Sequence, residues 1–335
     1  MENSSPPVPC STPDRGALMT ASSNRPAPPL PSDVPVPPEE RTGGIVSIDP
    51  VLSPDLKALY ERRITRLTAL EEKAGEDGGN YLAFLRHLVE LQTRQLEQAP
   101  LSPQDMATMA VWLNSTVMPS AEALAEAPFW QEIFRTFIAE LASALPAPQT
   151  EALQQTSRDI PELARQAHLL LTGNFSEANQ LLAVPLFAVL SLCWAQGASM
   201  LLATEEARKA RAEPEAVNCP CCGALAVASL VMTGGREGLR YQECSLCETR
   251  WHRVRSLCTV CGESGKLNYW SLDEQKAPVE VETCGDCLSY VKLIRLDRDP
   301  QQEGVADDLG TFPLDGLIVE KSFTRSTINP FALPL

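Results

Sequence analysis

The segment that decides the fold begins with CPCCGALAVASLVMTGGREGLRYQECSLC (219–247) and continues through CTVC (258–261) to CGDC (284–287). Nine of the eleven cysteines lie in it. A Cys-x-x-Cys turn directs two sulfurs at one metal ion, so each such pair supplies half of a tetrahedral site. Gly223 and Gly262 each follow a pair and can adopt the positive φ that this turn favours. Eight cysteines form four pairs and are the predicted metal ligands: Cys219, Cys222, Cys244, Cys247, Cys258, Cys261, Cys284 and Cys287.

The spacing between the pairs predicts two similar modules. There are 21 residues between Cys222 and Cys244, and 22 between Cys261 and Cys284. Such spacing is typical of two metal-binding turns bridged by a β-hairpin, which favours pairing in serial order. A cross-braced arrangement, joining the first pair to the third and the second to the fourth, stays open. The segments between the pairs are β-type, with strands expected at 225–232, 239–243, 267–271, 279–282 and 289–295.

Four thiolates per site suit either zinc or iron, so we expect two such ions, each coordinated by four cysteines. A structural site of this kind contributes on the order of 10 kcal/mol to folding, so loss of the metal should unfold the module. The competing interpretation is thiol redox chemistry at one pair, with Cys221 as a third thiol. It is disfavoured because a redox Cys-x-x-Cys usually opens a helix, whereas these pairs lie in β turns.

The region before the cysteines has helical periodicity. Apolar residues recur at three to four residue steps, with the clearest run in 130–141. Ser53 and Pro54 are predicted to begin the first helix, and others are expected near 102–114, 160–172 and 185–210. Residues 181–203 are uncharged over 23 positions, long enough to cross a membrane. A buried core helix is favoured over a stable membrane insertion, because the flanks carry no marked basic cluster.

These patterns predict an α+β protein in four segments. Residues 1–43 hold 11 of the 28 prolines and are expected to be a disordered tail, with Cys10 an incidental thiol. Residues 44–212 are expected to be a helical domain, a helical bundle in class. Residues 213–295 are the predicted tandem four-cysteine metal-ribbon domain, and residues 296–335 a C-terminal arm packing on the body.

Charge and motif content narrow the function. With 28 basic and 43 acidic residues the net charge is −15, which disfavours nucleic acid as a partner. The chain start resembles no secretory signal, so a cytoplasmic location is expected. We find no phosphate loop or nucleophile elbow and do not predict an enzyme. Asp307 and Asp308 are interpreted as a solvated helix face, His252 as a surface strand histidine, and Cys193 as a small buried apolar side chain.

The run GLRYQECSLCETRWHRVRSLCTVCGESGKLNYWSLD (238–273) resembles the formate dehydrogenase accessory protein family, FdhE. The segments CPCCG (219–223), FWQEIF (129–134), VADDL (305–309) and RSTINPF (325–331) fit the same family, as does Trp194 in the late apolar helix. The resemblance covers about residue 45 to the end of the chain. The proline-rich tail falls outside it.

The resemblance implies a cytoplasmic assembly factor that binds the catalytic subunit of respiratory formate dehydrogenase during its maturation. It also implies that the cysteine pairs form rubredoxin-like or zinc-ribbon sites for iron or zinc. Residues between the pairs are candidates for holding the client: Arg240, Tyr241, Trp251, Arg253, Tyr269 and Trp270. A rubredoxin-like redox partner and a zinc ribbon that binds nucleic acid are the alternatives. The oligomeric state is left open.

Overall fold

The structure is a computed structural model of the whole chain. The residues that it describes are 19–22, 48–115, 117–142, 145–213, 215–272 and 276–332. The expected disordered tail, with Cys10, therefore lies outside the described residues, apart from a short strand at Met19–Ser22 (β1).

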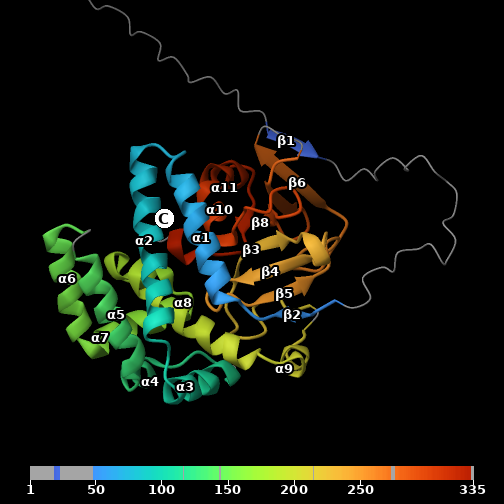
Figure 1. Cartoon of the computed structure of the whole chain (residues 1–335). Coiled ribbons are helices and arrows are strands. Elements are labelled where there is room, and N and C mark those ends of the chain that lie inside the picture. The colour runs from blue at the N-terminus through green and yellow to red at the C-terminus, as the bar shows by residue number, and fades with distance from the viewer. Residues whose placement is uncertain are drawn as a thin grey trace, which may run out of the picture.

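The N-terminal half is a layer of helices on one side of the molecule (Figure 1). Short connections separate them, several of them marked by Pro or Gly as the sequence predicted. The helices are α1 (Leu56–Glu71), α2 (Glu76–Gln98), α3 (Pro103–Asn114), α4 (Ala121–Ala125), α5 (Pro128–Leu141), α6 (Ala147–Arg158), α7 (Ile160–Leu171), α8 (Gln180–Leu201) and α9 (Glu205–Ala210), with a 3-10 turn η2 (Phe175–Glu177).

Two predicted helix boundaries are wrong. Helix α1 begins two residues later than Ser53 and Pro54 suggested, because the side chain of Asp55 accepts a hydrogen bond from the Ala58 N–H and caps it. The single helix expected over 185–210 is two helices. Helix α8 ends at Leu201, and the Thr204 hydroxyl caps a new helix, α9.

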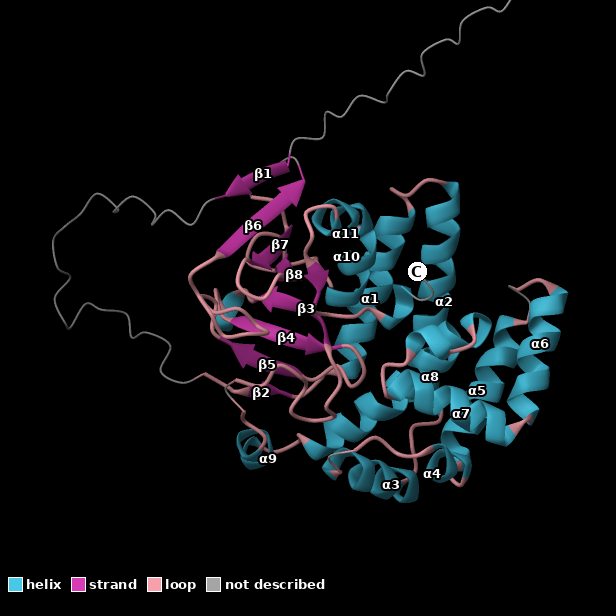
Figure 2. Ribbon diagram, turned by 180° about the vertical axis from the view of Figure 1, so that it is seen from behind, coloured by secondary structure: helices cyan, strands magenta, loops and turns pink. Residues whose placement is uncertain are grey.

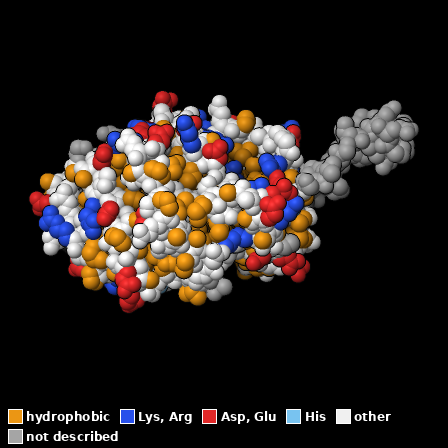
Figure 3. Space-filling view, turned by 60° about the horizontal axis from the view of Figure 1, so that its bottom comes forward, with side chains coloured by type: hydrophobic (Ala, Val, Ile, Leu, Met, Phe, Trp, Pro, Cys, Tyr) orange, Lys and Arg blue, Asp and Glu red, His pale blue; other side chains and the backbone are white. Residues whose placement is uncertain are grey.

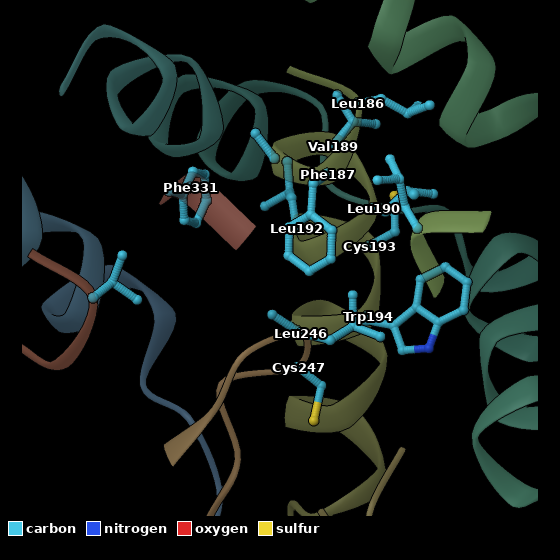
Figure 4. Packing of buried hydrophobic residues seen from close by; sticks show 14 of the residues in the cluster. Leu186, Phe187, Val189, Leu190, Leu192, Cys193, Trp194, Leu246, Cys247 and Phe331 are labelled. Atoms are coloured by element: carbon cyan, nitrogen blue, oxygen red, sulfur yellow. The ribbon is translucent and has the colours of Figure 1, made fainter. Parts of the chain in front are cut away.

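Helix α8 is the central element of the apolar core. It is long and apolar enough to cross a membrane, yet 94% of its most hydrophobic window is buried inside the protein. It packs against α2, α3, α5 and α7, and Trp194 stacks on Trp112 with ring centroids 5.5 Å apart. A Cβ at Gly197 would lie 2.9 Å from Met109 and Leu113, so glycine lets α3 approach closely. The core-helix interpretation is therefore confirmed (Figure 4).

The C-terminal half is built on one sheet, which in the described residues has nine strands. Its order is β1-β6-β7-β8-β3-β4-β5-β2, and β9 pairs with β8. The strands other than β1 are β2 (Val51–Leu52), β3 (Ala226–Val231), β4 (Arg240–Cys244), β5 (Arg250–Arg253), β6 (Leu267–Leu272), β7 (Val279–Cys284), β8 (Ser289–Arg295) and β9 (Thr324–Arg325).

The two predicted hairpins are present, and they share this sheet. Strands β3 and β4 pair antiparallel, and so do β6 and β7. The modules join through β3 and β8, which run parallel, with Ser229 opposite Leu293. Strand β2, which precedes the helical layer in sequence, adds to the edge at β5. The modules are thus halves of one continuous sheet.

The C-terminal segment is more regular than the predicted arm. It forms α10 (Gly304–Gly310), α11 (Phe312–Val319), β9 and a 3-10 turn η4 (Pro330–Ala332). Helix α10 packs against α1 on one side and against β3 and β8 on the other, so it lies between the helical layer and the sheet (Figure 2). Phe331 lies edge-on to Phe187 of α8 at 6.2 Å.

Candidate metal centres

The first group of cysteines comes from the turn before β3 and the turn after β4. Cys219, Cys222, Cys244 and Cys247 have sulfur atoms that all lie within 4.8 Å of one another. The Sγ atoms of Cys219 and Cys247 are 3.6 Å apart, and those of Cys222 and Cys244 are 3.4 Å apart. Hairpin β3–β4 brings the two turns together because its strands are antiparallel, so the start of β3 lies beside the end of β4.

The second group repeats this arrangement on the other half of the sheet. Cys258, Cys261, Cys284 and Cys287 also have sulfurs within 4.8 Å of one another. Cys258 and Cys287 are 3.7 Å apart, as are Cys261 and Cys284. The cysteines thus converge in serial order, and the cross-braced alternative is wrong.

The geometry of both groups fits a tetrahedral metal ion. With metal–sulfur bonds of about 2.3 Å, sulfurs at the corners of a tetrahedron lie about 3.8 Å apart. The separations of 3.4 to 3.7 Å are close to that value. Four thiol donors without nitrogen or oxygen suit zinc or iron. Each group can therefore hold one such ion.

The turns share one backbone device. The residue after the second cysteine of every pair has a positive φ, between 56° and 77°: Gly223, Glu248, Gly262 and Leu288. Within the turns, backbone N–H groups point back at sulfur, as when the Cys247 N–H donates to Cys244 Sγ at 3.3 Å. The sequence indicated the two glycines. Nothing in the sequence indicated a positive φ at Glu248 or Leu288, because residues other than glycine rarely adopt it.

Burial makes the thiolate form of Cys219 and Cys222 unfavourable without a cation. It raises the pKa of the Cys219 and Cys222 thiols well above their ordinary value, because a buried thiolate loses its hydration. A divalent ion offsets this cost by stabilising the thiolates directly. The donor set and its burial therefore suit a resident metal ion.

A buried ion-pair network joins the first group to the helical layer. Arg63 of α1 is fully buried, and its guanidinium donates to both carboxylate oxygens of Glu248 at 2.8 and 3.0 Å. The same guanidinium donates to Glu303, the N-cap of α10, at 2.9 Å. Nearby, Arg211 donates to the carbonyls of Pro220 and Cys221 at 3.3 and 3.2 Å. The end of the helical layer is thus tied to the first turn.

The adjacent acids in VADDL are buried, so their interpretation as a solvated face is wrong. Asp307 pairs with Arg66 of α1 at 2.6 Å, although burial still raises its pKa to about 6. Asp308 accepts from Arg325, and from Asn329 at 2.9 Å. VADDL and RSTINPF therefore meet in space, and their charges fix α10 and the C-terminal segment to the sheet.

Most of the candidate client-binding residues are structural. Arg240, Tyr241, Trp251 and Arg253 are at most 7% exposed, so they are not available to a partner. Arg240 of β4 forms a two-point ion pair with Glu282 of β7 and so bridges the two halves of the sheet. Tyr269 and Trp270 are partly buried, and their role stays a prediction.

The remaining thiols and His252 occupy ordinary positions. Cys193 is fully buried in α8, as expected of a small apolar side chain. Cys221 is buried beside the first group but is not one of its four members. His252 lies on β5 with its ring edge-on to Tyr241, and it is half-buried, so burial lowers its pKa.

A groove of about 930 Å³ runs beside the first group, between it and the helical layer. Trp112, Phe175 and Leu246 line it, and the rim residues Val117 and Val217 are 72% and 39% exposed. Figure 3 brings forward the side of the molecule that carries α3 and α9, and hydrophobic side chains gather across the middle of this face. The groove was not foreseen, because its walls come from distant segments.

Two four-sulfur sites on a shared sheet, held under a layer of helices, define a protein of the tandem rubredoxin-like or zinc-ribbon class. The chain belongs to the FdhE family. Residues 48–211 match FdhE, N-terminal; residues 218–255 match FdhE, central domain; and residues 257–332 match FdhE, C-terminal domain.

Individual relatives agree with this membership. The chain is 38% identical to a Protein FdhE homolog of Edwardsiella ictaluri over 301 residues, covering 88% of this chain and 95% of that protein. It is 37% identical to Protein FdhE of Escherichia coli, covering 88% and 94% respectively. The crystal structure of the FdhE protein from Pseudomonas aeruginosa superimposes with a TM-score of 0.69 at 30% identity, covering 85% of this chain and 99% of that chain.

Proposed function

We propose that this protein is a non-catalytic accessory factor for formate dehydrogenase, which binds the catalytic subunit of that enzyme in the cytoplasm while it matures. The observation that carries the proposal is the match to the FdhE N-terminal, central and C-terminal segments across residues 48–332. The net charge of −15 supports a protein client over nucleic acid. The burial of α8 supports a protein that is not inserted in a membrane.

The eight cysteines are, in this proposal, the ligands of two iron or zinc ions, one in each group. A bound ion supplies a four-way cross-link between two turns that the small ribbon core could not hold by apolar contacts alone. The chain's own part is to present the sulfurs at tetrahedral distances and to orient them with backbone N–H donors. The result is a rigid platform that the helical layer supports.

The client role is tested in cells of the source organism that lack this protein. We expect formate dehydrogenase activity to be lost, and to return when the full chain is supplied. The chain should also co-purify with the catalytic subunit of formate dehydrogenase when that subunit carries an affinity tag. Normal formate dehydrogenase activity in the deletion cells would defeat the proposal.

A second candidate is a redox partner with rubredoxin-like iron, favoured by one observation. Cys261 of the second group is exposed, and electron transfer requires a site near the surface. Protein purified without oxygen should then contain iron that can be reduced and reoxidised reversibly. A preparation that contains zinc alone and still restores formate dehydrogenase maturation would exclude this candidate.

A further inference from the structure

The two cysteine groups lie in different surroundings although their turns fold alike. Cys244 and Cys247 are 0% exposed and belong to the main apolar core, the one that contains α8. Figure 4 shows Cys247 and Leu246 beside the side chains of that helix. In the second group, Cys258 and Cys284 form a small separate cluster with Leu267, and Cys261 is exposed. The groove beside the first group is lined by Cys219 and Cys222 but by neither Cys244 nor Cys247, so it approaches that group from one side.

One pair of equivalent residues makes the difference specific. Glu248 follows the last cysteine of the first group, and Leu288 follows the last cysteine of the second. Both have a left-handed backbone, with φ of 60° and 56°. Glu248 is 2% exposed, whereas Leu288 is 53% exposed. The same turn therefore faces the protein interior in one module and solvent in the other.

Glu248 is held by a buried partner from the helical layer. Arg63 donates to both of its carboxylate oxygens, and neither side chain is more than 2% exposed. If the turn at 244–248 opened, the Arg63 guanidinium would lose one of its two carboxylate partners inside the core. Leaving a buried charge unpaired is strongly unfavourable. The second turn of the first site therefore cannot open unless α1 also separates from the sheet.

The second group has weaker surroundings. The Ser289 hydroxyl lies 2.9 Å from Cys287 Sγ, and Val260 between the first two cysteines is 37% exposed. Among the described residues, the ion pair beside this group is Lys266–Asp286, with the lysine side chain 66% exposed. Exposed pairs of this kind contribute about 0 to 1 kcal/mol. The buried Arg253 donates to the Thr259 carbonyl at 3.0 Å and so restrains the turn at 258–261. Opening the turn at 284–288 breaks only the exposed Lys266–Asp286 pair among the ion pairs of the described residues.

We propose that the second site is an exchangeable metal site, whose ion leaves and returns while the rest of the fold stays in place. The first site is permanent, because Arg63 and Glu248 lock its second turn to the helical layer. This inference rests on the proposed ligation of two ions by the eight cysteines. It is independent of the proposed client.

The test uses the full chain loaded with zinc and the chromogenic chelator 4-(2-pyridylazo)resorcinol. We expect zinc to be released in two phases of one equivalent each, with rates that differ by about tenfold or more. Cys261→Ser should remove the fast phase and keep the slow one. Cys193→Ala, a buried thiol outside both groups, should keep both. Release in a single phase, or a fast phase that survives in Cys261→Ser, would overturn the inference.

The lock is tested with matched substitutions. Glu248→Gln should accelerate the slow phase by about tenfold or more, because the buried Arg63 loses a charged partner. Leu288→Gln, at the equivalent position, should leave the slow phase unchanged. An equal effect of the two substitutions on the slow phase would contradict the lock.

Hydrogen exchange gives a readout on the unaltered chain, should Glu248→Gln fail to fold. Protection of α1 should stay constant while the first zinc equivalent leaves, and fall with the second. Loss of α1 protection with the first equivalent would overturn the inference. A loaded chain that holds fewer than two zinc ions would instead contradict the proposed ligation, so the two failures are distinguishable.

Discussion

Arg63 and Glu248 lie 185 residues apart in sequence and form a buried ion pair with two hydrogen bonds, at 2.8 and 3.0 Å. Because the guanidinium also binds Glu303, it joins three parts of the chain: the helical layer, the first metal turn and the start of α10. The two halves of the protein therefore act as one folding unit at this point.

Arg63→Met should lower the free energy of unfolding by about 3 to 5 kcal/mol, because two buried carboxylates lose their partner. Urea unfolding followed by circular dichroism measures the change. The control is Arg94→Met on α2, whose pair with Glu140 is 46% and 44% exposed. That substitution should cost at most about 1 kcal/mol. Equal losses of unfolding free energy in the two variants would show that the buried network stabilises the fold no more than an exposed ion pair does.

Asp308→Asn should release the C-terminal segment. Asp308 is 1% exposed and pairs with Arg325 and with Lys292, which lies 3.4 Å away. Removing one charge from a buried set of this kind is expected to lower stability by about 3 kcal/mol. Limited proteolysis should then cut after residue 310 faster than in the unaltered chain. The exposed Glu320→Gln serves as control, and resistance equal to that control would contradict the prediction.

Gly304→Ala should destabilise the contact between α10 and the sheet. A Cβ at this position would overlap the Oε2 atom of Glu243 and lie 3.1 Å from its carboxyl carbon. Glu243 is fully buried and held by Arg250, so it cannot move aside freely. Gly316→Ala in α11 meets nothing within 4 Å. It should be neutral or stabilising by up to about 1 kcal/mol. The midpoint temperature of thermal unfolding should therefore fall in Gly304→Ala and stay the same or rise in Gly316→Ala. Equal shifts in the two variants would contradict the prediction.

Cys247→Ser should lower the metal content of the purified protein by at least one ion per chain, because three thiolates and a hydroxyl form a much weaker soft-metal site. Elemental analysis measures iron and zinc together. Cys193→Ala should keep the full content, since that thiol lies in the α8 core. An unchanged metal content in Cys247→Ser would show that this cysteine is not a ligand.

The local features of the ribbon were predictable because their signals are local. Cys-x-x-Cys spacing, a hairpin between the pairs and a glycine after the turn each involve neighbouring residues. Their spacing along the chain favoured the serial grouping of cysteines that the structure shows, although it left the cross-braced arrangement open. The amphipathic run that became α5 was predictable for the same reason, since its apolar face repeats within one helix.

The long-range polar contacts were not predictable. Asp307 and Asp308 were assigned to solvent because charged residues are usually exposed. Their partners, Arg66 and Arg325, come from α1 and from the C-terminal segment, and no periodic pattern links them. Tyr241 and Trp251 were likewise assigned to a client surface, yet strand pairing turned both into the protein interior. Burial of a strand residue depends on what covers the sheet, which is decided far away in sequence.

Parallel pairing of β3 with β8, together with the 240-residue separation of Arg63 from Glu303, has a consequence for synthesis on the ribosome. At about 5 to 20 residues per second, the arginines of α1 emerge roughly 10 to 50 seconds before their acidic partner. During that interval Arg63 can gain only Glu248 of its two carboxylate partners, and Arg66 does not yet have Asp307. The ion pairs between α1 and α10 can therefore form only when nearly the last residues have been translated.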